Sequence, residues 1–150
     1  MGKHIRRRHS CRSAGFTLIE LMIAVLILGI LVAIAMPQYQ QYVTNSYQST
    51  CAAKLVEMSN QMERIFTENQ TYQPGGSAPS ANDLVNTATC PADTQPAPYN
   101  LSVNVPDDTS YTLSATPQGR QANNSDCGTL TLDQAGVRTA GGSASGEECW

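Results

Sequence analysis

A long apolar run near the N-terminus limits what this chain can fold into. From Gly15 to Met36 the sequence reads GFTLIELMIAVLILGILVAIAM, with Glu20 as its single charged residue. At about 1.5 Å of rise per residue, a helix of this length crosses about 30 Å of hydrocarbon. A carboxylate within such a helix costs roughly 2.5–3.5 kcal/mol on insertion scales. The sequence therefore predicts a membrane-spanning helix over residues 16–36 and a partner for Glu20.

A short basic leader, residues 1–15, precedes the run. It holds five of the nine Lys and Arg residues, namely Lys3, Arg6, Arg7, Arg8 and Arg12. Positive charge before an apolar span predicts that the leader stays in the cytoplasm while the rest is translocated. The alternative is an ordinary secretory signal cut near Ala33 or Ala35. The length of the run and the charge of Glu20 disfavour it.

Charge and histidine content narrow the classes of function. Residues 16–150 contain four basic side chains and all twelve acidic ones, which gives a net charge of −8. Both histidines, His4 and His9, lie in the leader. Once the leader is removed, no histidine is left for Ser-His-Asp or Cys-His catalysis or for a zinc site. We therefore expect no catalytic residues, no cofactor and no metal.

The cysteines indicate an oxidising compartment. The chain has five, at positions 11, 51, 90, 127 and 149, and loss of the leader removes Cys11. An even number on the translocated side predicts two disulfides. Four cysteines allow three pairings, and their positions alone do not choose among them.

The helical pattern continues past the membrane segment. Apolar residues recur at steps of mostly three and four, which predicts an amphipathic helix over residues 37–69; they are Tyr39, Tyr42, Val43, Tyr47, Cys51, Leu55, Met58, Met62, Ile65 and Phe66. Gly29 lowers helix propensity and Pro37 removes one backbone hydrogen bond. We expect a helix break at these two residues, as a bend or as local melting between them.

The remaining residues predict a small sheet. Residues 70–98 are rich in Pro, Gly, Ser and Asn, and predict a long loop with one helical turn near Asp83–Val85. Alternating apolar residues then predict an antiparallel sheet over about residues 99–138, with strands at 100–105, 111–115 and 129–132. The helix would cover its apolar face, and Cys149 would hold the tail, residues 139–150. The fold class is α+β.

Two polar clusters each allow two interpretations. Asp107 and Asp108 could bind calcium, but they lack the spacing of a calcium loop and favour a solvated hairpin turn. Lys54, Arg120 and Arg138 could form a local basic patch for nucleic acid. The net charge of −8 opposes long-range attraction of a polyanion, and the sequence shows no basic stripe. Nucleic-acid binding is therefore not expected.

The start of the chain resembles a known family. Gly15-Phe16-Thr17-Leu18-Ile19-Glu20 after a basic leader is similar to the class III signal of type IV pilins and pseudopilins. The resemblance implies cleavage by prepilin peptidase between Gly15 and Phe16, and N-methylation of Phe16. It also implies the pilin architecture, in which a long N-terminal helix packs on a small antiparallel sheet.

Later segments resemble the PilE-type minor pilins. They are Tyr111–Pro117, Cys127-Gly128, Leu130–Arg138 and the terminal Cys149-Trp150. This resemblance implies a Cys127–Cys149 disulfide that closes the C-terminal region. Cys51 would then pair with Cys90, a bridge that is not a fixed feature of that group.

The resemblance also supplies a partner for Glu20. Cleavage would free an α-amine on Phe16, one helical turn from the Glu20 carboxylate. If neighbouring subunits are staggered by about one turn, Glu20 meets the amine of the next copy, and a paired carboxylate is tolerated among apolar helices. Pairing within one subunit and a carboxylate that reaches the lipid headgroups are the alternatives.

These features imply a structural minor pilin of a type IV pilus that supports pilus biogenesis, twitching motility and adhesion. The expected partners are other pilin subunits, prepilin peptidase and the inner-membrane assembly machinery. The precursor would lie in the bacterial inner membrane with its head, residues 37–150, in the periplasm, and then enter the extracellular pilus. The alternatives are a type II secretion pseudopilin, which the disulfide-bound C-terminal region disfavours, a DNA-uptake or adhesin pilin, and a tethered periplasmic enzyme.

Overall fold

The computed structural model describes residues 15–124 and 126–150 of the chain. The basic leader up to residue 14, with its histidines and Cys11, lies outside the described residues. The chain divides into two compact units, Met1–Gln38 and Tyr39–Trp150. We describe each unit by itself.

One long helix, α1 (Leu18–Asn69), contributes to both units. Its start is capped, because the backbone amide of Glu20 donates to the Thr17 hydroxyl oxygen at 3.3 Å. Helix is assigned without interruption through Gly29 and Pro37. The structure thus shows helix at both residues, and the helix break expected there stays a prediction.

The first unit exposes its apolar side chains. The large apolar side chains from Phe16 to Met36 are all more than half exposed, from 80% for Phe16 to 51% for Ile27. An 18-residue window of α1 has a mean hydropathy of 3.0, and none of that window is buried. By length and composition, α1 is the one described helix able to cross a membrane.

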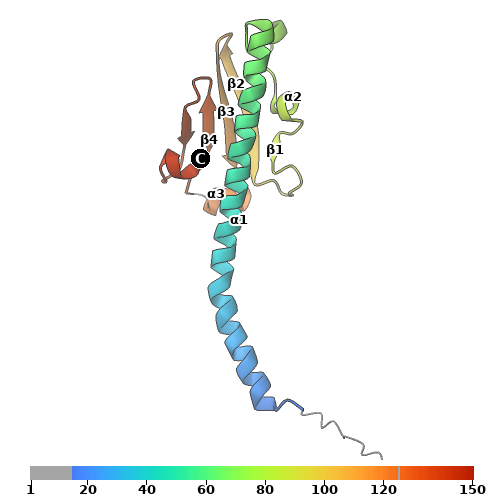
Figure 1. Ribbon diagram of the computed structural model, residues 1–150, viewed down its shortest axis with the longest axis vertical. Coiled ribbons are helices and arrows are strands. Elements are labelled where there is room, and N and C mark those ends of the chain that lie inside the picture. The colour runs from blue at the N-terminus through green and yellow to red at the C-terminus, as the bar shows by residue number, and fades with distance from the viewer. Residues whose placement is uncertain (1–14, 125) are drawn as a thin grey trace, which may run out of the picture. The chain divides into compact units, whose positions relative to one another are not determined.

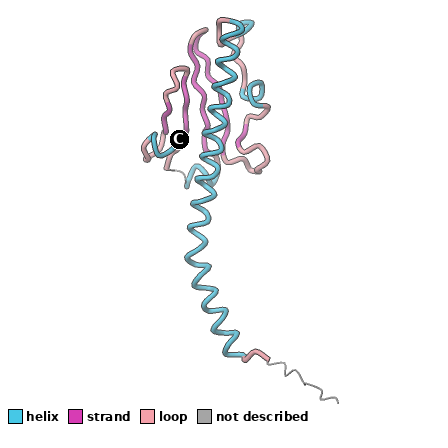
Figure 2. Tube along the Cα trace, viewed as in Figure 1, coloured by secondary structure: helices cyan, strands magenta, loops and turns pink. Residues whose placement is uncertain are grey.

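The second unit is built on a five-stranded antiparallel sheet in the order β1-β2-β3-β4-β5 (Figures 1 and 2). Its strands are β1 (Thr89–Cys90), β2 (Tyr99–Asp107), β3 (Ser110–Pro117), β4 (Leu130–Asp133) and β5 (Arg138–Ala140). The sequence predicted the three longer strands and missed β1 and β5. Strands of two and three residues are too short to show an alternating pattern.

The core lies between the sheet and the second half of α1, which Figure 1 shows along the sheet. Each fully buried Leu or Met side chain contributes about 1.5–3 kcal/mol; those of α1 are Leu55, Met58 and Met62. The predicted stripe is therefore correct from Cys51 onward. It is wrong at Tyr39 and Tyr42, which are 65% and 73% exposed. The α+β fold class is confirmed.

Short helices occupy the connections. The loop before the sheet holds the 3₁₀ turn η1 (Pro74–Gly76) and α2 (Ala81–Val85), which matches the predicted helical turn. Ser80 and Asp83 form a reciprocal cap at the start of α2. The Ser80 hydroxyl and then its backbone amide donate to the Asp83 carboxylate, which lowers the pKa of Asp83. Two further helices, α3 (Gly119–Asn124) and α4 (Gly146–Cys149), lie where the sequence predicted only loops.

Two disulfides fasten the second unit. Cys51 of α1 is bonded to Cys90 of β1, and Cys127 is bonded to Cys149 of α4. The Cys127–Cys149 bond is the one that the resemblance implied, and Cys51–Cys90 is the pair expected for the two remaining cysteines. The first ties the loop before the sheet to the helix, and the second ties the C-terminal tail to the residues before β4.

Candidate functional site

The start of α1 presents an exposed carboxylate. Glu20 is exposed, and within the described part of the chain no cation lies within ion-pair distance of it. Thr17 and Glu20 form the T-x-x-E pattern of a helix N-terminus, and a negative charge in the first turn is favourable beside the helix dipole. The carboxylate is therefore accessible to groups from outside the described chain.

A second carboxylate, Glu63, joins the helix to the sheet. Tyr72 and Tyr111 both donate from their hydroxyls to Glu63 Oε1, at 2.9 and 3.0 Å. Ser59, one turn earlier on α1, lies 2.9 Å from the Tyr111 hydroxyl. The two tyrosine rings meet edge to face with centroids 4.8 Å apart, an arrangement favoured by aromatic pairs.

This cluster shifts the acidity of both tyrosines. Burial, then the hydrogen bond and charge of Glu63, raises the pKa of Tyr72 well above its usual range. Burial, with a further contribution from Glu63, raises the pKa of Tyr111 to about 12, against the lowering effect of the Ser59 hydrogen bond. The phenols stay neutral and act as hydrogen-bond donors at physiological pH, so the cluster is structural.

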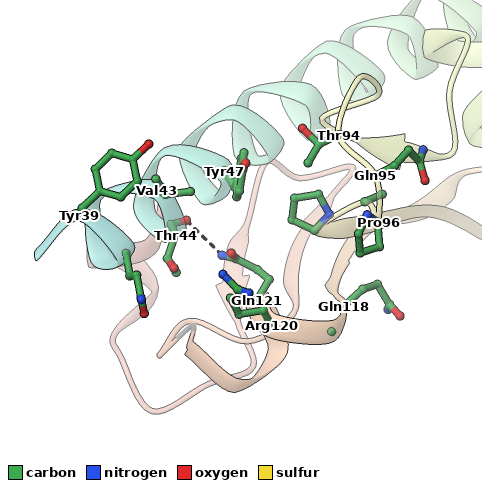
Figure 3. Close-up of a pocket in the computed structure, with 14 residues that line it drawn as sticks. Tyr39, Val43, Thr44, Tyr47, Thr94, Gln95, Pro96, Gln118, Arg120 and Gln121 are labelled. Atoms are coloured by element: carbon green, nitrogen blue, oxygen red, sulfur yellow. Dashed lines mark hydrogen bonds between the residues drawn. The ribbon is translucent and has the colours of Figure 1, made fainter. Parts of the chain in front are cut away.

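A cavity of about 430 Å³ lies beside the start of the second unit (Figure 3). Three segments line it: residues 39–47 on α1, the loop residues 94–98, and residues 118–121 at the start of α3. Its walls combine tyrosine, proline and glutamine side chains with one charged side chain, Arg120. Such a mixture of apolar surface and a few polar groups is typical of a small-ligand site.

Gln121 fixes one wall of this cavity. Its side chain is only 5% exposed. Its Nε2 donates to the Thr44 carbonyl (Figure 3) and to the Tyr99 hydroxyl, both at 3.1 Å. Both amide hydrogens are thereby used, while Oε1 accepts no hydrogen bond from any residue that the structure describes. A buried acceptor without a donor costs about 1–3 kcal/mol, so this oxygen is suited to a ligand or a water.

The two aspartates of the β2–β3 hairpin form hydrogen bonds that stabilise the turn. Asp107 accepts hydrogen bonds from Thr109 and Ser110, which lower its pKa. The Asp108 carboxylate accepts from the Thr71 hydroxyl at 2.9 Å. Within residues 15–124 and 126–150, no three His, Cys, Asp or Glu side chains gather as metal ligands. The predicted hairpin turn is confirmed.

The four described basic side chains are dispersed. Lys54 pairs with Glu57 at 2.7 Å and Arg64 with Glu68 at 3.1 Å. Arg138 lies over the Trp150 ring, with its guanidinium carbon 5.3 Å from the centroid. Arg120 lines the cavity. Two of the four are thus ion-paired along α1, one lies over Trp150 and one lines the cavity.

Sequence reasoning placed Glu20 correctly at the helix start but missed the cavity and the Glu63 cluster. Glu63 lies off the predicted apolar stripe, although Ser59, Met62 and Phe66 share its helical neighbourhood. Its partners Tyr72 and Tyr111 are 9 and 48 residues away. No local pattern in the sequence marks contacts over such separations.

Two family models match the chain. One, described as type IV minor pilin ComP, DNA uptake sequence receptor, matches residues 37–131. The other, the prokaryotic N-terminal methylation motif, matches residues 10–36. Together they cover the apolar segment and most of the second unit.

Individual relatives agree with these matches. The chain is 32% identical over 114 residues to the type IV major alpha-pilin of Moraxella bovis, covering 73% of this chain and 70% of that one. It is 39% identical over 82 residues to the type IV major fimbrial protein FimA of Dichelobacter nodosus. That match covers 46% of this chain and 51% of FimA, so the chain spans about half the length of that relative.

Comparison of structures shows the same fold. The non-core minor pilin PilV of Neisseria meningitidis superposes with a TM-score of 0.50 and 19% sequence identity. The match covers 68% of this chain and 90% of PilV.

Proposed function

The chain belongs to the type IV pilin family, and from this premise we propose that it is a minor subunit of a type IV pilus. Its proposed function is to assemble with other subunits through the N-terminal helix. The proposal is carried by the exposed apolar segment over residues 16–36 with Glu20 in its first turn. Such a surface is costly in water, so it needs a bilayer or a bundle of like helices around it.

Processing precedes assembly in this proposal. Prepilin peptidase cleaves between Gly15 and Phe16, and the new N-terminal Phe16 is methylated. The match of the methylation motif to residues 10–36 supports this step. So does the local structure, because Phe16 lies outside α1 and is 80% exposed, where an enzyme can reach it.

Glu20 then sets the register of the assembled helices. A carboxylate among apolar helices is tolerated when it is paired, and the cleaved amine of a neighbouring Phe16 is the nearest new cation that processing creates. Misaligned packing would leave Glu20 unpaired among apolar helices, and it is therefore disfavoured. If Glu20 instead pairs with the Phe16 amine of its own subunit, the pair does not set the register between neighbouring subunits.

The subunit is stored in the inner membrane with its head in the periplasm, and the assembly machinery then moves it into the extracellular pilus. There it supports pilus biogenesis, twitching motility and adhesion. The minor role is supported by the match to the ComP minor-pilin model, although several individual relatives are major pilins. A type II secretion pseudopilin is less favoured, because the C-terminal disulfide and the relatives point to pili.

The test is incorporation into filaments. An epitope-tagged chain is expressed in its host, pili are sheared from the cells, and the tag is quantified against the major subunit. We expect the tag in the sheared fraction at a small fraction of the major subunit. A chain found only in the inner membrane, or in a periplasmic pseudopilus of a secretion system, would contradict the proposal.

DNA uptake is a second candidate function. It is favoured by the match of residues 37–131 to a family model described as a DNA uptake sequence receptor. Against it, the head carries four basic and eleven acidic side chains, and two of the basic ones are ion-paired. Gel-shift binding of the full chain to double-stranded DNA at moderate salt distinguishes this candidate from a purely structural subunit.

A further inference from the structure

The cavity lined by residues 39–47, 94–98 and 118–121 has a chemistry that the assembly function does not use. We propose that it holds the headgroup of a phospholipid with a primary amine, of the phosphatidylethanolamine type, while the subunit is stored in the membrane. The inference rests on the proposed membrane storage. It assigns a ligand to a site outside the apolar segment, residues 16–36, through which the subunit is proposed to assemble.

Chain connectivity limits the distance between the apolar segment and the nearest edge of the cavity. Tyr39, which lines the cavity, follows the last residue of the apolar run, Met36, by three positions. Three residues span at most about 11 Å even when fully extended. The polar headgroup layer adds roughly 5–8 Å on each side of the hydrocarbon. The edge of the cavity at Tyr39 therefore lies within reach of the headgroups, whatever the angle between the two units.

A buried acceptor in the wall calls for a donor. Gln121 is 5% exposed, and its Nε2 is fully used by Thr44 and Tyr99. The Thr44 carbonyl can only accept, which fixes the orientation of the Gln121 amide and leaves Oε1 as the free atom. A primary ammonium group carries three N–H donors, so it satisfies this oxygen. A trimethylated amine carries no N–H and does not.

The positive charge of Arg120 favours a phosphate as the second group of the ligand. Arg120 supplies the single charge of the lining, and no carboxylate is present among the lining residues. None of the ion pairs in the described chain involves Arg120. A guanidinium binds phosphate through two parallel hydrogen bonds. The ethanolamine phosphate headgroup carries both groups, an ammonium for Gln121 Oε1 and a phosphate for Arg120, and both residues line the cavity.

The net charge of the head favours a zwitterionic lipid over an anionic one. With eleven acidic and four basic side chains, the head is repelled by a membrane surface that carries net negative charge. A phosphatidylethanolamine headgroup carries no net charge, so it avoids that repulsion. The tyrosine and proline side chains of the lining provide apolar contacts for the glycerol region.

Native mass spectrometry of the full chain in mild detergent tests the proposal. Phosphatidylethanolamine, phosphatidylcholine and phosphatidylglycerol with the same acyl chains are titrated in turn. We expect one phosphatidylethanolamine retained per chain, with about tenfold weaker retention of the other two, the size of one charge-assisted hydrogen bond. Soluble glycerophosphoethanolamine in excess should displace the lipid if the headgroup alone is recognised.

Two variants locate the site. Arg120→Gln should weaken phosphatidylethanolamine retention about tenfold. Arg138→Gln, which removes an exposed arginine outside the cavity, should leave retention unchanged. Equal retention of all three lipids, or equal effects of the two variants, would overturn the proposal. Loss of DNA binding in Arg120→Gln with unchanged lipid retention would assign the cavity to DNA instead.

The outcome is separable from that of the pilin proposal. Filament incorporation depends on residues 16–36, whereas lipid retention depends on Arg120 and Gln121. A chain that enters pili normally but shows no lipid preference refutes the lipid site alone. A chain that retains the lipid but never enters pili refutes the filament role alone.

Discussion

The Tyr111 hydroxyl donates to Glu63 Oε1 at 3.0 Å, which joins the middle of the sheet to α1 across 48 residues of sequence. Tyr111 lies on β3, the central strand of the sheet, and its side chain is 1% exposed. The hydrogen bond runs from this buried residue to Glu63, an exposed residue of α1. The contact therefore helps to fix how α1 is seated on the sheet.

Removing this hydroxyl should destabilise the head. We expect Tyr111→Phe to lower the free energy of unfolding by about 1–2 kcal/mol, since a hydrogen bond to a charged group is lost while the ring remains. Thermal or urea unfolding of the full chain in detergent measures the change. Tyr47→Phe is the matched control, because no hydrogen bond of its hydroxyl is found within the described chain. An equal loss in both variants would contradict the assigned contact.

The same contact predicts an alkaline transition. The folded pKa of Tyr111 is raised to about 12, above the value near 10 of an unfolded tyrosine. Ionisation is therefore easier in the unfolded chain. The stabilisation is fully present below about pH 10 and is lost as the pH rises through about 12. Unfolding midpoints between pH 8 and 12 should fall steeply for the natural chain and less for Tyr111→Phe, and parallel curves would refute the link.

Each disulfide should contribute separately to stability. The chain-entropy relation gives about 4 kcal/mol for Cys51–Cys90, which closes the longer loop, and about 3 kcal/mol for Cys127–Cys149. Replacing each pair by serines and measuring urea unfolding tests this order. Peptide mapping of the unreduced chain should recover the same two pairs, and a Cys51–Cys127 peptide would contradict them.

Local sequence signals account for the helix, the longer strands and the site at the helix start. The Thr17–Glu20 spacing, the apolar run and the alternation in β2 and β3 each act over a few residues. What escaped prediction depends on distant contacts. β1 is held by pairing with β2 and by the Cys90 disulfide, and the cavity exists only where Thr44, Pro96 and Gln121 meet in space. The exposed Tyr39 and Tyr42 follow the helical period, but the sheet does not extend to cover them.

A close backbone approach makes Gly142 intolerant of a side chain. A Cβ there would overlap the Asp126 carbonyl oxygen and the Cys127 carbonyl carbon, both backbone atoms that cannot move aside. We expect Gly142→Ala to destabilise the chain by about 1–3 kcal/mol. The neighbouring Gly141→Ala is the control, because its Cβ would come no closer than 3.5 Å to Thr129. Unfolding curves of the two variants that coincide would contradict the predicted overlap.

Glu20 gives the sharpest test of assembly. Glu20→Ala should leave cleavage after Gly15 intact, because the cut lies outside α1 and precedes the pairing. Incorporation into sheared pili should fall by about tenfold or more, since the amine of the neighbouring Phe16 loses its partner among apolar helices. Glu20→Gln keeps the shape and removes the charge. If charge pairing sets the register, incorporation of Glu20→Gln should fall nearly as far as that of Glu20→Ala.

The matched control for Glu20 is Glu57→Gln on the head, which removes one acidic charge far from the apolar segment and breaks only the exposed contact with Lys54. We expect normal incorporation of that variant. Mass analysis of the mature chain completes the test, because the pairing requires an N-terminus at Phe16. If Glu20→Ala enters pili normally, or if the mature chain begins elsewhere, the carboxylate has no partner to meet and the assembly role assigned to it is wrong.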